Sequence, residues 1–120
     1  MKETKSTNPE LVKLIRLLKK QGNENKAKIW REVAIHLAKT RQHRAAVNLS
    51  RINRYTKKSD MIVVPGKILG TGTIDHAITI AALNASEKAK EKLGAAEAKF
   101  LSIKELVKEN PAGSKVKILR

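Results

Sequence analysis

The spacing of apolar residues changes at about Ala45, and this change constrains the fold more than any other feature of the 120-residue chain. Before it, apolar side chains recur at intervals of about three to four residues, which predicts two amphipathic helices over 9–20, closed by Gly22, and over 26–39. Because an apolar stripe on one helix must be covered by another element, we expect the two helices to form a helical hairpin.

After Ala45 the apolar runs become short, which is typical of short strands interleaved with short helices. The predicted strands are 45–47, 61–64, 77–83 and 115–119, and the predicted helices are 49–56, 86–93 and 102–110. Asn48 and Ser86 have side chains typical of N-caps, and Gly94 is a typical helix end.

The expected architecture is therefore an α/β fold of the mixed α+β kind. An N-terminal helical hairpin precedes a small globule of irregular short strands and helices. We predict two parts, a basic helical extension over 1–44 and a globular RNA-binding domain over 45–120.

Positive charge indicates the class of partner. Lys and Arg number 26 against 11 Asp and Glu, which gives a net charge of +15 and a pI near 10.4. From Lys39 to Lys58 there are seven basic residues and no acidic one. A small protein with this charge is best neutralised by a polyanion, so nucleic acid is the expected partner. The alternative is a solvated basic surface without a partner.

The sequence NLSRINRYTKK lies inside this basic segment. Leu49 and Ile52 are three residues apart, so they anchor one side of a short helix while Arg51, Arg54 and Tyr55 point elsewhere. Arginine pairs its planar donors with phosphate oxygens, and lysine adds a point charge. The candidate RNA-binding residues of this region are Arg41, His43, Arg44, Asn48, Ser50, Arg51, Asn53, Arg54, Tyr55, Thr56, Lys57 and Lys58.

The stretch VVPGKILGTG has the glycines of a phosphate-binding loop but not their order. A nucleotide-binding loop ends in Gly-Lys followed by Ser or Thr at the start of a helix, whereas Lys67 here comes early. Pro65 and Gly66 instead suit the central positions of a type II turn. We predict a turn whose exposed amides and Lys67 could contact a backbone phosphate.

Catalysis, cofactor binding and metal binding find no support in the sequence. The three histidines are scattered, cysteine is absent, and no histidine has a second ligand at a spacing typical of metal sites. The only aromatic residues are Trp30, Tyr55 and Phe100, too few for a sheet that stacks several bases. No apolar run is long enough for a transmembrane helix. We therefore expect neither an enzyme nor a membrane protein, and no cofactor.

Three segments together resemble one family: VNLSRINRYTKKSDMIVVPGKILGTG, ITIAALNASEKAKEKLG and LVKENPAGSKVKIL. They are similar to the archaeal and eukaryotic large-subunit ribosomal proteins called eighteen-e, relatives of bacterial large-subunit protein fifteen, and the short chain favours an archaeal source. The resemblance implies a non-catalytic, cytoplasmic protein that binds and stabilises folded large-subunit rRNA, contacts neighbouring ribosomal proteins and is a monomer when free. It places RNA contacts on Asn48, Ser50, Arg51, Asn53, Arg54, Tyr55, Lys57, Pro65, Gly66, Lys67 and Gly70.

Two other functions remain open from the residues alone. The helices within 9–39 could form a DNA-binding helix-turn-helix, although the second offers no Asn, Gln or Ser after its start to read bases. The apolar face from Leu11 to Leu18 could also lie on an anionic membrane or a partner protein.

Overall fold

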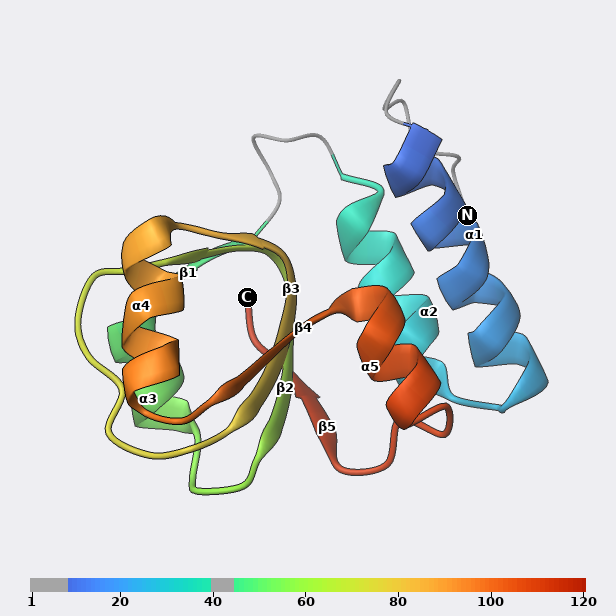
Figure 1. Cartoon of the computed structure of the whole chain (residues 1–120). Coiled ribbons are helices and arrows are strands. Elements are labelled where there is room, and N and C mark those ends of the chain that lie inside the picture. The colour runs from blue at the N-terminus through green and yellow to red at the C-terminus, as the bar shows by residue number, and fades with distance from the viewer. Residues whose placement is uncertain (1–8, 40–44) are drawn as a thin grey trace.

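A parallel β-sheet with helices on both faces forms the centre of the computed structural model, which describes residues 9–39 and 45–120 (Figure 1). Along the chain, its elements are α1 (Pro9–Glu24), α2 (Lys28–Leu37), β1 (Ala45–Asn48), α3 (Leu49–Tyr55), β2 (Met61–Leu69), β3 (Thr79–Ala85), α4 (Glu87–Ala95), β4 (Lys99–Ser102), α5 (Ile103–Glu109) and β5 (Val116–Ile118). The predicted α/β fold with an N-terminal helical hairpin is confirmed.

The sheet is built around β2. The strand order is β1-β2-β3-β4, and β5 also pairs with β2. β3 runs along one edge of β2, so the other edge is shared: β5 pairs with its first part, at Met61 to Val63, and β1 with its last part, at Gly66 to Leu69. Parallel neighbours need crossover connections, and α3 and α4 serve as two of them.

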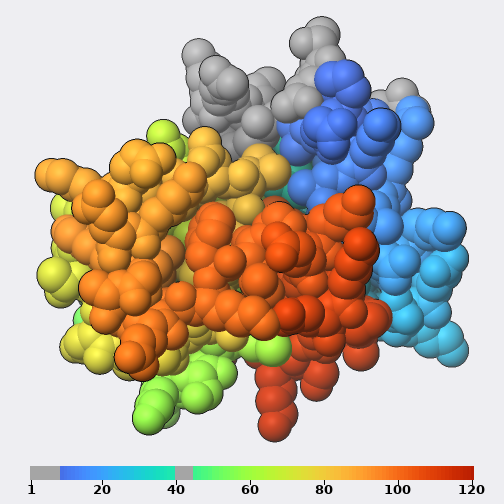
Figure 2. Space-filling model, in the orientation of Figure 1, coloured from blue at the N-terminus to red at the C-terminus, as the bar shows by residue number. Residues whose placement is uncertain are grey.

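Side chains of the strands alternate between two cores, as the period of a β-strand requires. Val63 and Ala81 face the core shared with α1, α2 and α5, whereas Ile62, Val64 and Ile80 face the core shared with α3 and α4. The space-filling view shows α4 and α5 next to each other at the front of the molecule, with α1 beside α5 (Figure 2). The sheet thus separates α3 from the helical hairpin.

The hairpin is fixed to the rest of the molecule by Trp30. This side chain is fully buried, and its indole Nε1 donates a hydrogen bond to the carbonyl oxygen of Pro111 at 2.8 Å. The bond joins α2 to the segment that leads into β5.

Several predicted boundaries were wrong. Gly22 does not end the first helix, because α1 continues to Glu24; instead Gly22 lets the side chain of Arg31 from α2 lie against the backbone of α1. Gly94 lies within α4, and the left-handed residue that follows this helix is Glu97, with φ 59°. The sequence did not predict β4 at all.

Candidate nucleic-acid interface

The helix α3 is anchored on one side and basic on the other. Leu49 and Ile52 are fully buried in the core with α4, while Ser50, Arg51 and Arg54 are exposed. This is the arrangement that the three-residue spacing predicted. Since the anchored side cannot rotate, the arginines start from a fixed backbone, which lowers the entropy lost when they bind phosphate.

Both arginines of α3 lie against the ring of Tyr55. The Cζ atom of Arg51 is 5.0 Å from the ring centroid, and that of Arg54 is 6.0 Å from it. These are cation–π distances, so the ring helps to orient the guanidinium groups. Tyr55 itself is 51% exposed.

The loop between β2 and β3 packs against α3 and is joined to it by two hydrogen bonds. The backbone N–H of Ser50 donates to the carbonyl of Thr71 at 3.1 Å, and the N–H of Asp75 donates to Asn53 Oδ1 at 3.2 Å. Gly72 has φ 89° and lies so close to Ser50 that a side chain there would collide with it. The loop and the basic helix therefore form one rigid unit.

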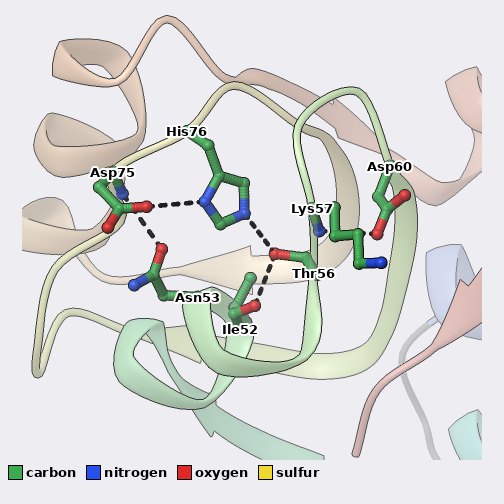
Figure 3. A network of polar contacts seen from close by, with 7 residues as sticks. All are labelled: Ile52, Asn53, Thr56, Lys57, Asp60, Asp75 and His76. Atoms are coloured by element: carbon green, nitrogen blue, oxygen red, sulfur yellow. Dashed lines mark hydrogen bonds and ion pairs between the residues drawn. The ribbon is translucent and has the colours of Figure 1, made fainter.

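A chain of hydrogen bonds fixes the C-terminal end of α3 (Figure 3). Thr56 Oγ1 donates to the carbonyl oxygen of Ile52 at 2.7 Å and also contacts His76 Nε2 at 2.7 Å. On its other side, His76 Nδ1 lies 2.8 Å from Asp75 Oδ1. The hydrogen bond from His76 holds the pKa of Asp75 below its usual value. Apart from the position of His76 next to Asp75, no sequence pattern indicated these partners.

This order of hydroxyl, imidazole and carboxylate resembles a hydrolytic triad, but the hydroxyl is not placed for attack. Thr56 is 7% exposed, and the Ile52 carbonyl, which can only accept, takes its single proton. Burial also corrects the prediction that Thr56 faces RNA. Its hydroxyl is used within the protein.

The turn after α3 carries two exposed lysines, Lys57 and Lys58. Asp60 closes this turn by accepting a hydrogen bond from the backbone N–H of Lys57 at 2.8 Å, and that bond is the main cause of its lowered pKa. Lys117 Nζ lies 3.3 Å from the same carboxylate. Because Asp60 is occupied in this way, the side chains of Lys57 and Lys58 add to the basic surface of α3.

The proline-glycine stretch is not a turn, which corrects the sequence prediction. Pro65 and Gly66 are buried in the middle of β2, and Gly66 lacks the positive φ that a type II turn needs. Proline has no N–H for the sheet, and the register against β3 shifts between Val64 and Lys67, which indicates a β-bulge. Within β2 only Lys67 is exposed, and the backbone of Pro65 and Gly66 is buried in the sheet.

Lys92 on α4 is a structural residue of the interface that the sequence did not reveal. Its Nζ donates to the carbonyl oxygens of Gly70 and Gly72 at 2.7 and 2.6 Å. Gly70, which the resemblance places among the RNA contacts, is half-buried and lies against Lys88. Lys92 therefore ties the loop under α3 to the neighbouring helix.

The structure brings most of the predicted contacts together, but not all of them can be placed. Asn48 and Asn53 are half-buried at the edge of the exposed basic residues, and the side chain of Asn48 makes no N-cap hydrogen bond, contrary to the prediction. The predicted contacts Arg41, His43 and Arg44 lie outside the described residues.

Within 9–39 and 45–120, no group of three or more His, Asp or Glu side chains could hold a metal ion. Over the same residues, no helix has the length and apolar character needed to cross a membrane.

Comparison with known proteins identifies the family. The family model described as "Ribosomal protein 60S L18 and 50S L18e" matches residues 1–120. The chain is 52% identical over 114 residues to the large ribosomal subunit protein eL18 of Methanoregula boonei, covering 95% of this chain and 94% of the relative. It is 44% identical over 119 residues to the protein of the same name from Methanococcus maripaludis, with 99% of each chain covered.

These matches confirm the resemblance seen in the sequence, and an archaeal origin fits them. Proteins of this family are structural components of the large ribosomal subunit in the cytoplasm and are not enzymes. The expected cytoplasmic location and the expected non-catalytic role are therefore confirmed. The chain belongs to the eL18 family of large ribosomal subunit proteins.

Proposed function

We propose that this protein binds and stabilises folded large-subunit rRNA through the exposed basic residues of α3 and the turn after it. This α3 surface consists of Ser50, Arg51, Arg54, Tyr55, Lys57 and Lys58. The observation that carries the proposal is the anchoring of α3: its apolar side is fully buried while both arginines remain exposed. Fixed arginines can make paired hydrogen bonds to phosphate oxygens.

The buried residues of the same region have a supporting role in this proposal. Thr56 and Gly66 shape the backbone, and Lys92 holds the loop beneath α3. Arg41, His43 and Arg44 stay predicted contacts, and Lys67 stays a predicted contact on β2.

The test is binding of the full-length protein to folded large-subunit rRNA over a range of salt concentrations. If about 8 to 10 phosphates are neutralised, log affinity falls against log salt with a slope of about −6 to −9. The double variant Arg51→Ala/Arg54→Ala should make the slope shallower by about 2 units, since each lost phosphate contact removes about 0.9. Its melting temperature should stay close to that of the wild type.

A matched control is available on the opposite side of the sheet. Lys104 and Lys108 are exposed on α5, so Lys104→Ala/Lys108→Ala removes the same charge at another place. This variant should keep the salt slope. Equal losses in both double variants would show that net charge, and not the α3 surface, determines affinity.

Duplex DNA at matched salt tests the alternative function. Preference for folded rRNA is expected from the proposal, whereas preference for duplex DNA would favour a helix-turn-helix that uses α1 and α2.

We further propose that the protein is a monomer when free and contacts neighbouring ribosomal proteins only in the subunit. Sedimentation of the purified chain at several concentrations measures this; a dimer would contradict it.

A further inference from the structure

We propose that Tyr55 and the two arginines beside it form a stacking site for one unpaired nucleotide base. The inference rests on the proposed function, because it assigns a base contact to the α3 surface. It predicts that the bound RNA is a helix interrupted by a bulge or loop at this point, and not a continuous duplex.

The first argument is the exposure of Tyr55. Of the three aromatic residues, Trp30 is fully buried and Phe100 packs against the core with α3 and α4. Only Tyr55 presents about half of its surface to solvent, and it does so within the most basic segment of the chain. A single exposed tyrosine is common on protein surfaces, so exposure alone does not define a site.

The second argument is that two arginine side chains lie beside the Tyr55 ring. Two guanidinium groups lie at 5.0 and 6.0 Å from its centroid. Aromatic rings and guanidinium planes are the two kinds of flat group on which proteins stack unpaired RNA bases. Arg51 and Arg54 can meanwhile direct donors to the phosphates on either side of the stacked base, so base and backbone contacts come from one cluster.

The third argument is rigidity. Tyr55 is the last residue of α3, and the next residue, Thr56, is held by its hydrogen bonds to Ile52 and His76. At the other end, the N–H of Ser50 is bonded to Thr71. A ring on a fixed backbone loses little freedom when a base stacks on it.

A continuous A-form duplex offers no unpaired base that could stack on Tyr55 and its two arginines. Its bases are stacked on one another, and a side chain outside the helix meets phosphates and 2′-hydroxyl groups instead. A bulged base is already unstacked on one side and can reach the ring without breaking a pair.

The experiment compares two RNA hairpins of the same length, one with a single bulged 5-iodouridine and one with that nucleotide paired to adenosine. Full-length wild type, Tyr55→Phe and Tyr55→Leu are titrated with each hairpin at the same salt. Stacking on an aromatic side chain contributes about 1–3 kcal/mol per base, so wild type should prefer the bulged hairpin by about fivefold or more. Tyr55→Phe, the matched control, should keep this preference, and Tyr55→Leu should lose it and bind the two hairpins with equal affinity.

Long-wavelength ultraviolet light gives a second readout, because iodouridine cross-links to aromatic rings stacked on it. Mass spectrometry should locate the cross-link at residue 55 in wild type and Tyr55→Phe and find none there in Tyr55→Leu. A bulge preference that survives in Tyr55→Leu, or a wild type that binds both hairpins equally without the cross-link, would overturn the stacking site and leave the phosphate-binding proposal intact. A wild type that binds neither hairpin nor large-subunit rRNA would overturn both.

Discussion

Gly66 lies where β2 pairs with the first residue of β1, and this contact leaves no room for a side chain. Its partner in the register is Ala45, and a Cβ at position 66 would overlap the carbonyl oxygen of that residue. Because backbone atoms cannot move aside as a flexible side chain can, we expect Gly66→Ala to lower the free energy of unfolding by about 1–3 kcal/mol or more. Urea unfolding of the full chain measures the loss.

Gly94 supplies the control for this substitution. A Cβ there would meet nothing within 4 Å, and the residue has no positive φ within α4. Gly94→Ala should therefore raise the free energy of unfolding by about 0.5–1 kcal/mol, because alanine loses less conformational entropy in a helix. If both variants lowered the free energy of unfolding by a similar amount, the close contact between Gly66 and Ala45 would not explain the effect of Gly66→Ala.

Asp75 gives the protein a dependence of stability on acid pH. Its pKa is lowered, chiefly by the hydrogen bond from His76, so the unfolded chain binds a proton more readily than the folded one. The stabilising contribution is present above the ordinary pKa of 3.8 and is lost as pH falls through the lower value of the folded protein. We expect wild type to be more stable than Asp75→Ala near neutral pH and this difference to shrink below about pH 4. Thermal unfolding of both proteins across this range would refute the idea if the difference stayed constant.

Single residues of the site differed in how far the sequence could predict them. Arg51, Arg54 and Tyr55 could be assigned to the surface, because the apolar pair that anchors α3 lies within the same few residues. The burial of Thr56 and Gly66 depends on partners 20 and 21 residues away in the sequence, His76 and Ala45. Local patterns contain no information on such contacts, and Pro-Gly suits a turn and a bulged strand equally well.

At the scale of elements, the helix N-termini differ in how they are capped. Ser102 Oγ accepts a hydrogen bond from the N–H of Glu105, and the carboxylate of Glu105 accepts one from the N–H of Ser102, a reciprocal capping box at the start of α5. We expect Ser102→Ala to lower the free energy of unfolding by about 1 kcal/mol. Urea unfolding is again the measurement.

Asn48 is the comparison for that prediction, because it occupies the N-cap of α3 without a side-chain cap bond. Asn48→Ala should cost clearly less stability than Ser102→Ala. If the Asn48 amide contacts RNA as predicted, the same variant should weaken rRNA binding. Equal destabilisation of the two variants would contradict this distinction between the caps.

The elements themselves were predictable where a periodic pattern was long enough. Both helices of the hairpin follow from their apolar stripes, although their ends were misplaced around Gly22. β4 has only four residues, with exposed Lys99 and Ser102 at its two ends and its two apolar residues next to each other, so no alternation marks it. It is a strand because it pairs with β3 from Thr79 to Ala82, and that pairing is a long-range contact.

For the molecule as a whole, the proposed RNA surface and the helical hairpin lie on opposite faces of the sheet. α3 belongs to the core with α4, whereas α1 and α2 share a core with α5 and the other face of the strands. Sequence alone could not predict this separation, because it depends on which edge of β2 each parallel strand occupies. The predicted division at residues 44 and 45 stays a prediction, but the shared core suggests how the two parts unfold.

The hairpin and the sheet should unfold together. Leu18, Trp30 and Leu37 are fully buried in the same core as Val63 of β2, and the Trp30 indole is bonded to Pro111. Removing the hairpin would expose to water the part of this core that α5 does not cover, at a cost of about 25 cal/mol for each Å² of apolar surface. Trp30 is the only tryptophan, so its fluorescence reports on the packing of the hairpin in this shared core.

Urea unfolding followed by Trp30 fluorescence should therefore have the same midpoint as loss of the β2 and β3 amide signals followed by NMR, because coincident transitions are the mark of one cooperative unit. The fragment 45–120 gives the complementary measurement. It should lack a cooperative transition, since its strands keep only the α3 and α4 side of the sheet and part of the other core. If the fluorescence midpoint came at clearly lower urea and the fragment unfolded cooperatively, the hairpin would be a separate domain docked on a globule that is stable without it.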